Sequence, residues 1–214
     1  ALNDPIGIAL DDAGNLYIAD RSNDRVRKVG PDGRISTITG TTGGAYPGDG
    51  GPASQAPIVN PFGVAVDQAG NLYISDQFYH SVRKILPDGT ISTAAGSGSA
   101  GFSGDGGSAI TASLNMPSGL ASDREGNLYI ADSENHRIRK VAADGKIQTV
   151  AGNGTPGFSG DEGAAHLAGL NHPEGIAADR AGNLYIADRD NHRIRKVGAD
   201  GIIRTIAGNG AEGF

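Results

Sequence analysis

Hydrophobic and polar positions follow one pattern that occurs four times along the chain. In the third occurrence the strands that it predicts are residues 120–122, 128–131, 137–141 and 146–151. The first two are apolar at consecutive positions, whereas the last two alternate apolar and polar residues. Turn sequences such as Asp144-Gly145 separate them. The pattern predicts an antiparallel meander whose first two strands are covered on both faces and whose last two are half exposed.

The four copies of this pattern are 56 residues apart. The segment Gly-Asn-Leu-Tyr-Ile-Ala-Asp begins at Gly14, Gly70, Gly126 and Gly182, with Ser replacing Ala in the second copy. One unit of this size cannot bury apolar surface on both faces of its own sheet, so neighbouring units must cover it. We therefore expect a single domain over residues 1–214, with repeats at about 2–57, 58–113, 114–169 and 170–214.

A glycine-rich connector of about 20 residues follows the fourth strand of each of the first three repeats. The connectors are residues 40–59, 96–115 and 152–171. An Ala-rich stretch at 163–168 predicts one or two helical turns. Because long loops without internal order are uncommon in compact domains, we expect the connectors to pack over the outer rim or one end of the assembly.

The consensus PxGIAxDxxGNLYIADxxNHRIRKV resembles the NHL repeat, whose signature is present as Asn135-His136-Arg137-Ile138 and again at 191–194. The likeness covers essentially the whole chain, although the first copy has Asp24 at the His position and the second has Tyr79 at the Asn position. It implies an all-β fold, a β-propeller of four-stranded antiparallel blades with four blades in this chain. Propellers of this family usually have six blades. A closed four-bladed ring, an arc of a larger ring and a ring of several chains therefore all stay open.

Composition narrows the classes of partner. The net charge of −6 does not favour nucleic acid or an anionic membrane, and the absence of cysteine excludes disulfides and thiolate chemistry. No apolar run reaches the roughly 18 residues of a spanning helix. The first residues lack the features of a signal peptide. We expect a bacterial, extracytoplasmic or secreted protein, excised from a longer chain whose signal peptide is not in this sequence.

Eleven of the 18 Lys and Arg residues lie in the third strands, where we expect their stems to cover blade edges.

The candidate ligand site is the face on which the interblade connectors and the second-to-third strand loops meet. Repeated polar residues there are Asp20, Asp76, Asp132, Asp188, His80, His136 and His192. A structural role is favoured for the Asp residues, each binding backbone N–H groups of its turn and an Arg or His one strand later. The repeat is most altered at 77–80, where Phe78 and Tyr79, with Tyr46, form either a contact surface or packing against the neighbouring connector.

Several catalytic and cofactor motifs are excluded. The GxGxxG sequences, as at 152–157, lie in connectors of an antiparallel protein, not in a βαβ unit. The three His residues belong to different blades, and a metal needs its ligands around one ion. One Asp in each Gly-Asp-Gly-Gly connector falls short of a calcium shell. We expect no catalytic residue, metal or cofactor.

The sequence thus favours a non-enzymatic binding or scaffolding propeller that takes a protein or small-molecule ligand. We expect no nucleic acid or membrane partner, and self-association could complete a ring. The alternative is a propeller lyase or lactonase with an axial metal site, because the family resemblance extends to such enzymes.

Overall fold

The computed structural model describes residues 1–40 and 47–213, which form four separate antiparallel sheets. We call these sheets blades 1 to 4 in chain order. Blades 1 and 2 consist of β1 (Pro5–Leu10), β2 (Leu16–Asp20), β3 (Arg25–Val29), β4 (Ile35–Thr39), β5 (Pro61–Val66), β6 (Leu72–Asp76), β7 (Ser81–Ile85) and β8 (Ile91–Ala95). Blades 3 and 4 consist of β9 (Pro117–Ser122), β10 (Leu128–Asp132), β11 (Arg137–Val141), β12 (Ile147–Ala151), β14 (Pro173–Ala178), β15 (Leu184–Asp188), β16 (Arg193–Val197) and β17 (Ile202–Ala207). The all-β prediction of four-stranded blades is confirmed.

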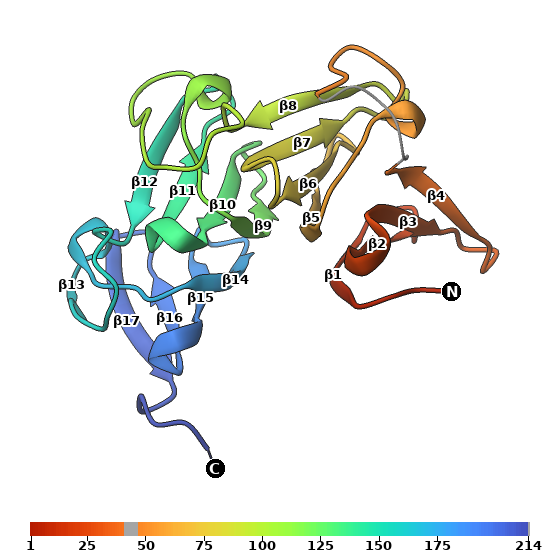
Figure 1. Cartoon of the computed structure of the whole chain (residues 1–214). Helices are drawn as coiled ribbons and strands as arrows, with labels where there is room; N and C mark the ends of the chain where they lie inside the picture. Colours follow the sequence, from red (N-terminus) through yellow and green to blue (C-terminus); the bar gives the residue numbers. More distant parts are fainter. Residues whose placement is uncertain (41–46, 214) are drawn as a thin grey trace.

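The blades are arranged as an arc around a common centre (Figure 1). The first strand of each blade lies on the inside, where β5 packs against both β1 and β9, and β9 packs against β14. The fourth strands β4, β8, β12 and β17 lie on the outside. Blades 1 and 4 stand at the two ends of the arc, with the chain termini beside them, so each of them contacts one neighbouring blade.

The strands of the third repeat lie close to their predicted positions. The second, third and fourth strands agree with the prediction to within one residue, but β9 begins at Pro117, three residues earlier than expected. Pro117 pairs with Asp132 beyond a bulge in the β9–β10 ladder. The tight interblade contact of the inner strands lies within this bulge, where Gly119 brings its backbone against Glu174 of β14.

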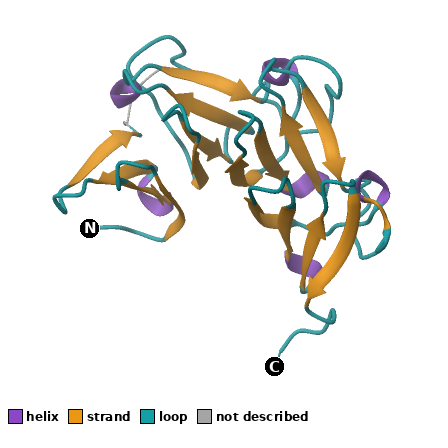
Figure 2. Ribbon diagram, turned by 180° about the vertical axis from the view of Figure 1, so that it is seen from behind, coloured by secondary structure: helices purple, strands orange, loops and turns teal. Residues whose placement is uncertain are grey.

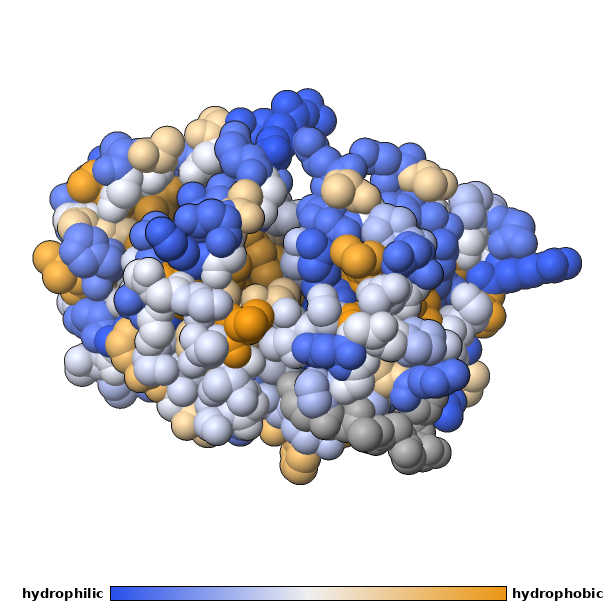
Figure 3. Space-filling view, turned by 90° about the horizontal axis from the view of Figure 1, so that it is seen from above, coloured by the Kyte–Doolittle hydropathy of each residue, from blue (hydrophilic) through white to orange (hydrophobic). Residues whose placement is uncertain are grey.

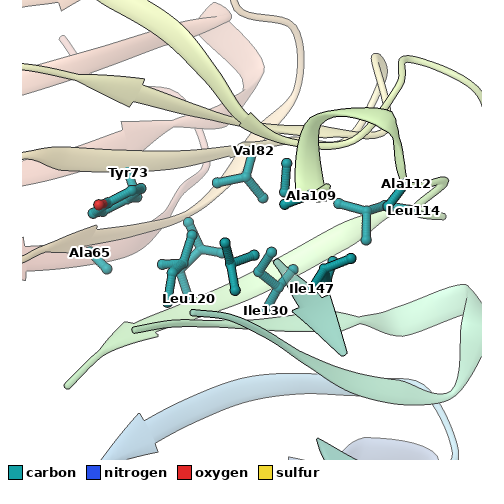
Figure 4. Packing of buried hydrophobic residues seen from close by; sticks show 12 residues of the cluster. Ala65, Tyr73, Val82, Ala109, Ala112, Leu114, Leu120, Ile130 and Ile147 are labelled. Atoms are coloured by element: carbon teal, nitrogen blue, oxygen red, sulfur yellow. The ribbon is translucent and has the colours of Figure 1, made fainter. Parts of the chain in front are cut away.

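The hydrophobic core is divided into three clusters, each lying between two successive blades. Figure 4 shows the cluster between blades 2 and 3, where Tyr73 and Val82 face Leu120 and Ile130. Ala109 of the intervening connector packs into the same cluster. Each fully buried Leu, Ile or Val contributes roughly 1.5–3 kcal/mol. Most of this burial depends on a neighbouring blade, as the two-sided apolar pattern predicts.

The faces at the ends of the arc keep the same residue types but are open to solvent. On blade 1, Ile8 is 67% exposed, whereas its counterpart Leu120 in blade 3 is 7% exposed. On blade 4, Ile194 is 37% exposed, whereas Ile138 is fully buried. A hollow of about 360 Å³ on this blade is lined partly by Ala187, Ile194 and Ala207. The two end faces therefore carry the same types of apolar residue as the three internal interfaces.

The connectors run along the outer rim of the blade that follows them. Three of the short 3-10 helices lie in them: η2 (Ala53–Gln55), η3 (Ala109–Thr111) and η5 (Ala165–Leu167). Figure 2 shows the helices of the chain in purple. In the third connector, β13 (Gly163–Ala164) also pairs with β17 as a fifth strand. For the described residues of the connectors, the predicted order is confirmed, and of the two positions expected for them they take the outer rim. The Ala-rich stretch forms one 3-10 turn. The helices of the described residues are such single turns, and none has the length or apolar character of a membrane span.

Candidate functional site

The repeated Asp residues at the ends of the second strands are fully buried. Asp132 accepts hydrogen bonds from the backbone N–H of Asn115 at 2.7 Å and from the side-chain amide of Asn135 at 2.9 Å. It also accepts one at 3.2 Å from Arg139 in the third strand. Asp188 has the same three partners one repeat later. These carboxylates therefore join the connector, the loop and the third strand of one blade, as the structural interpretation predicts.

Asp76 keeps the backbone donor from the connector but lacks the Asn side-chain donor, because Tyr79 replaces the Asn of the other repeats. Its carboxylate accepts from the backbone N–H groups of Val59 at 3.2 Å and Tyr79 at 3.1 Å. Burial raises the pKa of Asp76 to about 7, whereas that of Asp132 rises to about 6. The side-chain amide of Asn135 lowers the pKa of Asp132, whereas the backbone N–H of Tyr79 is the donor from the same position beside Asp76.

The last residue of the second-to-third strand loop in blades 1, 2 and 3 links that blade to the next one. His136 has left-handed backbone angles (φ 53°, ψ 42°), and its Nδ1 accepts a hydrogen bond at 3.2 Å from the backbone N–H of His172 in the next repeat. His80 accepts from Met116 in the same way at 3.2 Å. Asp24 does so from Asn60 at 2.8 Å. Burial lowers the pKa of His136, in keeping with a neutral acceptor.

His192 is the exposed counterpart of these residues at the end of the arc. It keeps the left-handed backbone (φ 50°, ψ 45°), but no further blade follows it within the described residues. The three predicted His residues are therefore equivalent positions on separate blades and do not converge. Direct contact of the repeated Asp and His residues with a ligand stays a prediction.

Sequence reasoning considered the Asp of each connector only as a calcium ligand and missed the ion pair that it forms. Asp105 lies 2.7 Å from Nη2 of Arg139, and Asp161 lies 2.8 Å from Nη2 of Arg195; Asp49 and Arg83 form the equivalent pair. The three guanidinium groups are fully buried, so these arginines do not cover blade edges with exposed heads as expected. The available signal was an Asp 34 residues before an Arg in three successive repeats.

An aromatic ring of the connector strengthens this attachment. The guanidinium of Arg137 stacks 3.8 Å from the ring centroid of Phe102, with Arg139 at 4.7 Å. Phe158 has the same contacts with Arg193 at 3.7 Å and Arg195 at 4.8 Å. The second and third connectors are thus each fixed to the third strand of the blade by an ion pair and by cation–π contacts.

Besides His192, the accessible part of the predicted site is the altered loop of the second repeat. Phe78 is 63% exposed, the Tyr79 side chain is partly buried, and their rings meet edge to face with centroids 5.1 Å apart. Tyr46, which was expected beside them, lies outside the described residues. Figure 3 shows a mainly hydrophilic surface on one side of the molecule, with isolated apolar patches. An exposed Phe on a loop is suited to contact with a partner.

Residues 1–40 and 47–213 contain no group of three or more His, Asp or Glu side chains placed to hold a metal ion. The closest approach to one is at the junction of blades 3 and 4. There His172 Nδ1 lies 2.6 Å from Asp190, and Nε2 lies 3.4 Å from Glu134. The two carboxylates face different ring nitrogens, so the three groups do not surround one point. This arrangement can support ion pairing between loops.

Two protein-family models match the chain. The NHL repeat matches residues 2–29 and 114–141, and the teneurin NHL domain matches residues 154–212. Protein SUPPRESSOR OF QUENCHING 1, chloroplastic, of Arabidopsis thaliana is 36% identical over 166 residues, 73% of this chain and 15% of that protein. Human Teneurin-4 is 32% identical over 224 residues, 92% of this chain and 8% of that protein. The chain thus spans a small part of the relatives that it matches.

Solved structures with the same architecture include a Bacteroides thetaiotaomicron protein of unknown function, with a TM-score of 0.68 and 27% identity over 95% of this chain and 47% of that one. The nidogen–laminin complex gives a TM-score of 0.65 and 21% identity, covering 96% of this chain and 63% of the other. A streptogramin B lyase gives 0.60 and 14%, covering 95% and 54%. The last two likenesses concern the fold alone.

Proposed function

Since the chain belongs to the NHL-repeat family and has the fold of a β-propeller, we propose that it is a binding or scaffolding protein that contacts a protein partner through the second-to-third strand loops. Its setting would be extracytoplasmic. The exposed aromatic of blade 2 is the centre of the proposed contact surface, which we define as Phe78 with Tyr79.

The exposure of Phe78 is the observation that carries this proposal. Apart from His192, the repeated polar side chains of the same face are buried or engaged with a neighbouring blade, so they stabilise the blades. Phe78 has no such role, because 63% of it is open to solvent. Large aromatic residues supply much of the binding energy of protein interfaces when a partner removes them from water.

A protein partner fits the surface better than a nucleic acid. The net charge of −6 opposes a polyanion. One solved structure of the same fold is a complex of nidogen with laminin, which illustrates that this architecture can take part in protein binding.

Site-specific photo-cross-linking tests the proposal. A photoreactive phenylalanine analogue replaces Phe78 in one protein and Glu125, an exposed residue of a first-to-second strand turn, in a control. Each is irradiated in extract of the source organism. A defined cross-linked product from position 78 alone, whose isolated partner binds the unmodified chain and loses affinity with Phe78→Ala, is the expected result. Equal products from both positions, or unchanged affinity of that partner for Phe78→Ala, would contradict the proposal.

The alternative function, a lyase or lactonase, requires an axial metal site. Such a site needs several ligands around one ion, and the part of the chain that the structure describes offers no such group. Turnover of a cyclic ester by the purified protein, abolished by a chelator and restored by a divalent metal, would favour the enzyme over the scaffold.

A further inference from the structure

A cavity of about 260 Å³ opens between blades 2 and 3, on the side of the sheets that carries the first-to-second and third-to-fourth strand turns. Blade 2 lines it with Tyr73 and Lys84, which are partners across β6 and β7, and with Ala94 of β8. Blade 3 lines it with apolar side chains that include Leu128 and Val141. Two internal blades therefore form this cavity, away from the second-to-third strand loops of the proposed partner surface.

Small side chains keep the cavity open. Ala94 takes the position that Ile38 has in blade 1 and Val150 has in blade 3. Each of these three residues packs against the core cluster of its own interface, so the shorter Ala94 leaves volume that its counterparts fill. Across the cavity, residues 142–143 are two alanines, whereas the same turn of blade 2 has Leu and Pro at 86–87. Since protein interiors are closely packed, open space at this point marks a position that can accommodate a ligand.

Lys84 places a positive charge at the cavity without an ion pair in the part of the chain that the structure describes. Its Nζ lies 5.7 Å from the ring centroid of Tyr73. Asp67, which also lines the cavity, already has four donors. Its Oδ1 accepts from the backbone N–H groups of Ala69 and Asn71, and its Oδ2 accepts from the side-chain amide of Asn71 and the hydroxyl of Tyr73. The ammonium group of Lys84 is therefore the polar group with donors left for a ligand.

The lysine and the tyrosine themselves belong to the repeat. Lys140 lies over Tyr129 in blade 3 at the same distance of 5.7 Å, and blades 1 and 4 have equivalent pairs. Blade 2 differs by having Ala94 in the fourth strand, where blade 3 has Val150. The combination of a cation with unfilled apolar volume is thus created by the alanine.

We propose that this cavity binds a small aromatic carboxylate, with its carboxylate on Nζ of Lys84 and its ring against Ala94, Leu128 and Val141. An apolar cavity of about 150 Å³ is large enough for benzene, so about 260 Å³ accommodates one substituted ring. An apolar lining with few polar groups is the usual composition of a small-molecule site. The ring of Tyr73 offers a further aromatic surface to the ligand.

The charge at the cavity selects an acid over other ligands of this size. A cationic ligand would be repelled by Lys84. A neutral hydrocarbon would remove water from the ammonium group without offering an acceptor, which is unfavourable. A carboxylate replaces that water by a charge-assisted hydrogen bond while the ring fills the apolar volume.

Titration of benzoate and of phenylacetate into the full chain, followed by the amide NMR signals, tests the proposal. Benzamide and phenylacetamide are the neutral controls of the same shape. We expect saturable shifts at Ala94, Leu128 and Ala143 with at least one acid. The matching amide should bind about tenfold more weakly, as expected for the loss of a charge-assisted hydrogen bond.

Three variants locate the binding site. Lys84→Gln should weaken binding of the acid about tenfold, whereas Lys140→Gln, the same change one blade later, should not alter it. Ala94→Val installs the residue of blade 3 and should weaken binding at least tenfold by filling the cavity. Circular dichroism establishes that the variants are folded.

Four outcomes would overturn the proposal. These are failure of both acids to bind, equal binding of an acid and its amide, equal effects of Lys84→Gln and Lys140→Gln, and unchanged binding by Ala94→Val. None of them bears on the proposed protein partner, because Phe78 does not line this cavity.

Discussion

The Cα of Gly63 in β5 lies directly against the backbone carbonyl oxygen of Ser118 in β9, with no room for a Cβ at residue 63. Gly63→Ala should therefore force the inner strands of blades 2 and 3 apart and lower the urea midpoint, by an equivalent of about 2–3 kcal/mol. Gly175 is the matched control, because at the end of the arc its Cβ would meet only Ala187 at 3.3 Å. Gly175→Ala should change stability by less than about 1 kcal/mol. Equal losses would show that interblade contact is not what Gly63 permits.

Removal of the Arg139 guanidinium should lower the free energy of unfolding substantially, because two buried or partly buried carboxylates lose a partner. Arg139→Gln leaves Asp132 buried with one donor fewer and Asp105 without its partner, and we expect a loss of about 3–5 kcal/mol in urea unfolding. Lys146→Gln breaks the exposed pair with Asp144 and should cost less than about 1 kcal/mol. A small effect of Arg139→Gln would mean that the connector is held chiefly by its backbone and by Ala109.

His136 and His192 share one backbone conformation but differ in their neighbours. His136→Ala removes the acceptor for the N–H of His172 and should cost about 1 kcal/mol more than His192→Ala at pH 8. The folded-state pKa of His136 is lowered, so its contribution is complete above the unfolded value of about 6.5 and is lost as the pH falls through the folded value. The difference between the two variants should thus shrink towards pH 5. A constant difference would exclude the neutral imidazole as the acceptor.

The raised pKa of Asp76 predicts that its contribution to stability decreases as the pH rises, which is opposite to the pH dependence of His136. Its folded pKa is raised to about 7, so its contribution to stability is complete below the unfolded value and is lost as the pH rises to about 7. Tyr79→Asn should supply the amide donor that Asp132 has, lower the pKa of Asp76, and make the loss smaller by about 1 kcal/mol between pH 4 and pH 8. Thermal unfolding across this range measures the effect. Tyr79→Phe keeps the ring without the amide and should retain the wild-type pH dependence.

Phe78→Ala is expected to leave the fold intact. The side chain is 63% exposed, so its loss should change the unfolding free energy by less than about 0.5 kcal/mol. A substantial loss of stability would instead assign Phe78 to packing against the neighbouring connector, the interpretation that the sequence alone left open.

The blades were predictable because the residues that specify each strand and each turn are close together in the sequence. Consecutive apolar residues such as Leu128 and Ile130 require cover on both faces, and Asp144-Gly145 specifies a tight turn between alternating strands. The repetition of both signals four times made the meander and its stacking foreseeable. The structural role of Asp132 could be predicted in the same way, because a residue that is repeated in every unit usually stabilises that unit.

The ion pairs of the connectors were harder to foresee, because their partners are distant along the chain. Asp105 and Arg139 are 34 residues apart, and their meeting depends on how the connector folds back along β12. The interblade role of His136 was equally difficult to predict. Its hydrogen-bond donor is the backbone N–H of His172, and every residue other than proline has such a group, so the sequence does not distinguish it.

The sequential packing of the blades has a kinetic consequence. Each core cluster joins only successive blades, so unfolding costs least at a blade with a single neighbour. Transient opening should begin by fraying of blades 1 and 4 and advance inward. Amide hydrogen exchange would then display a gradient, fastest in β1 and β4, whose outward face is the most exposed, and slowest in β10, which is covered from both sides.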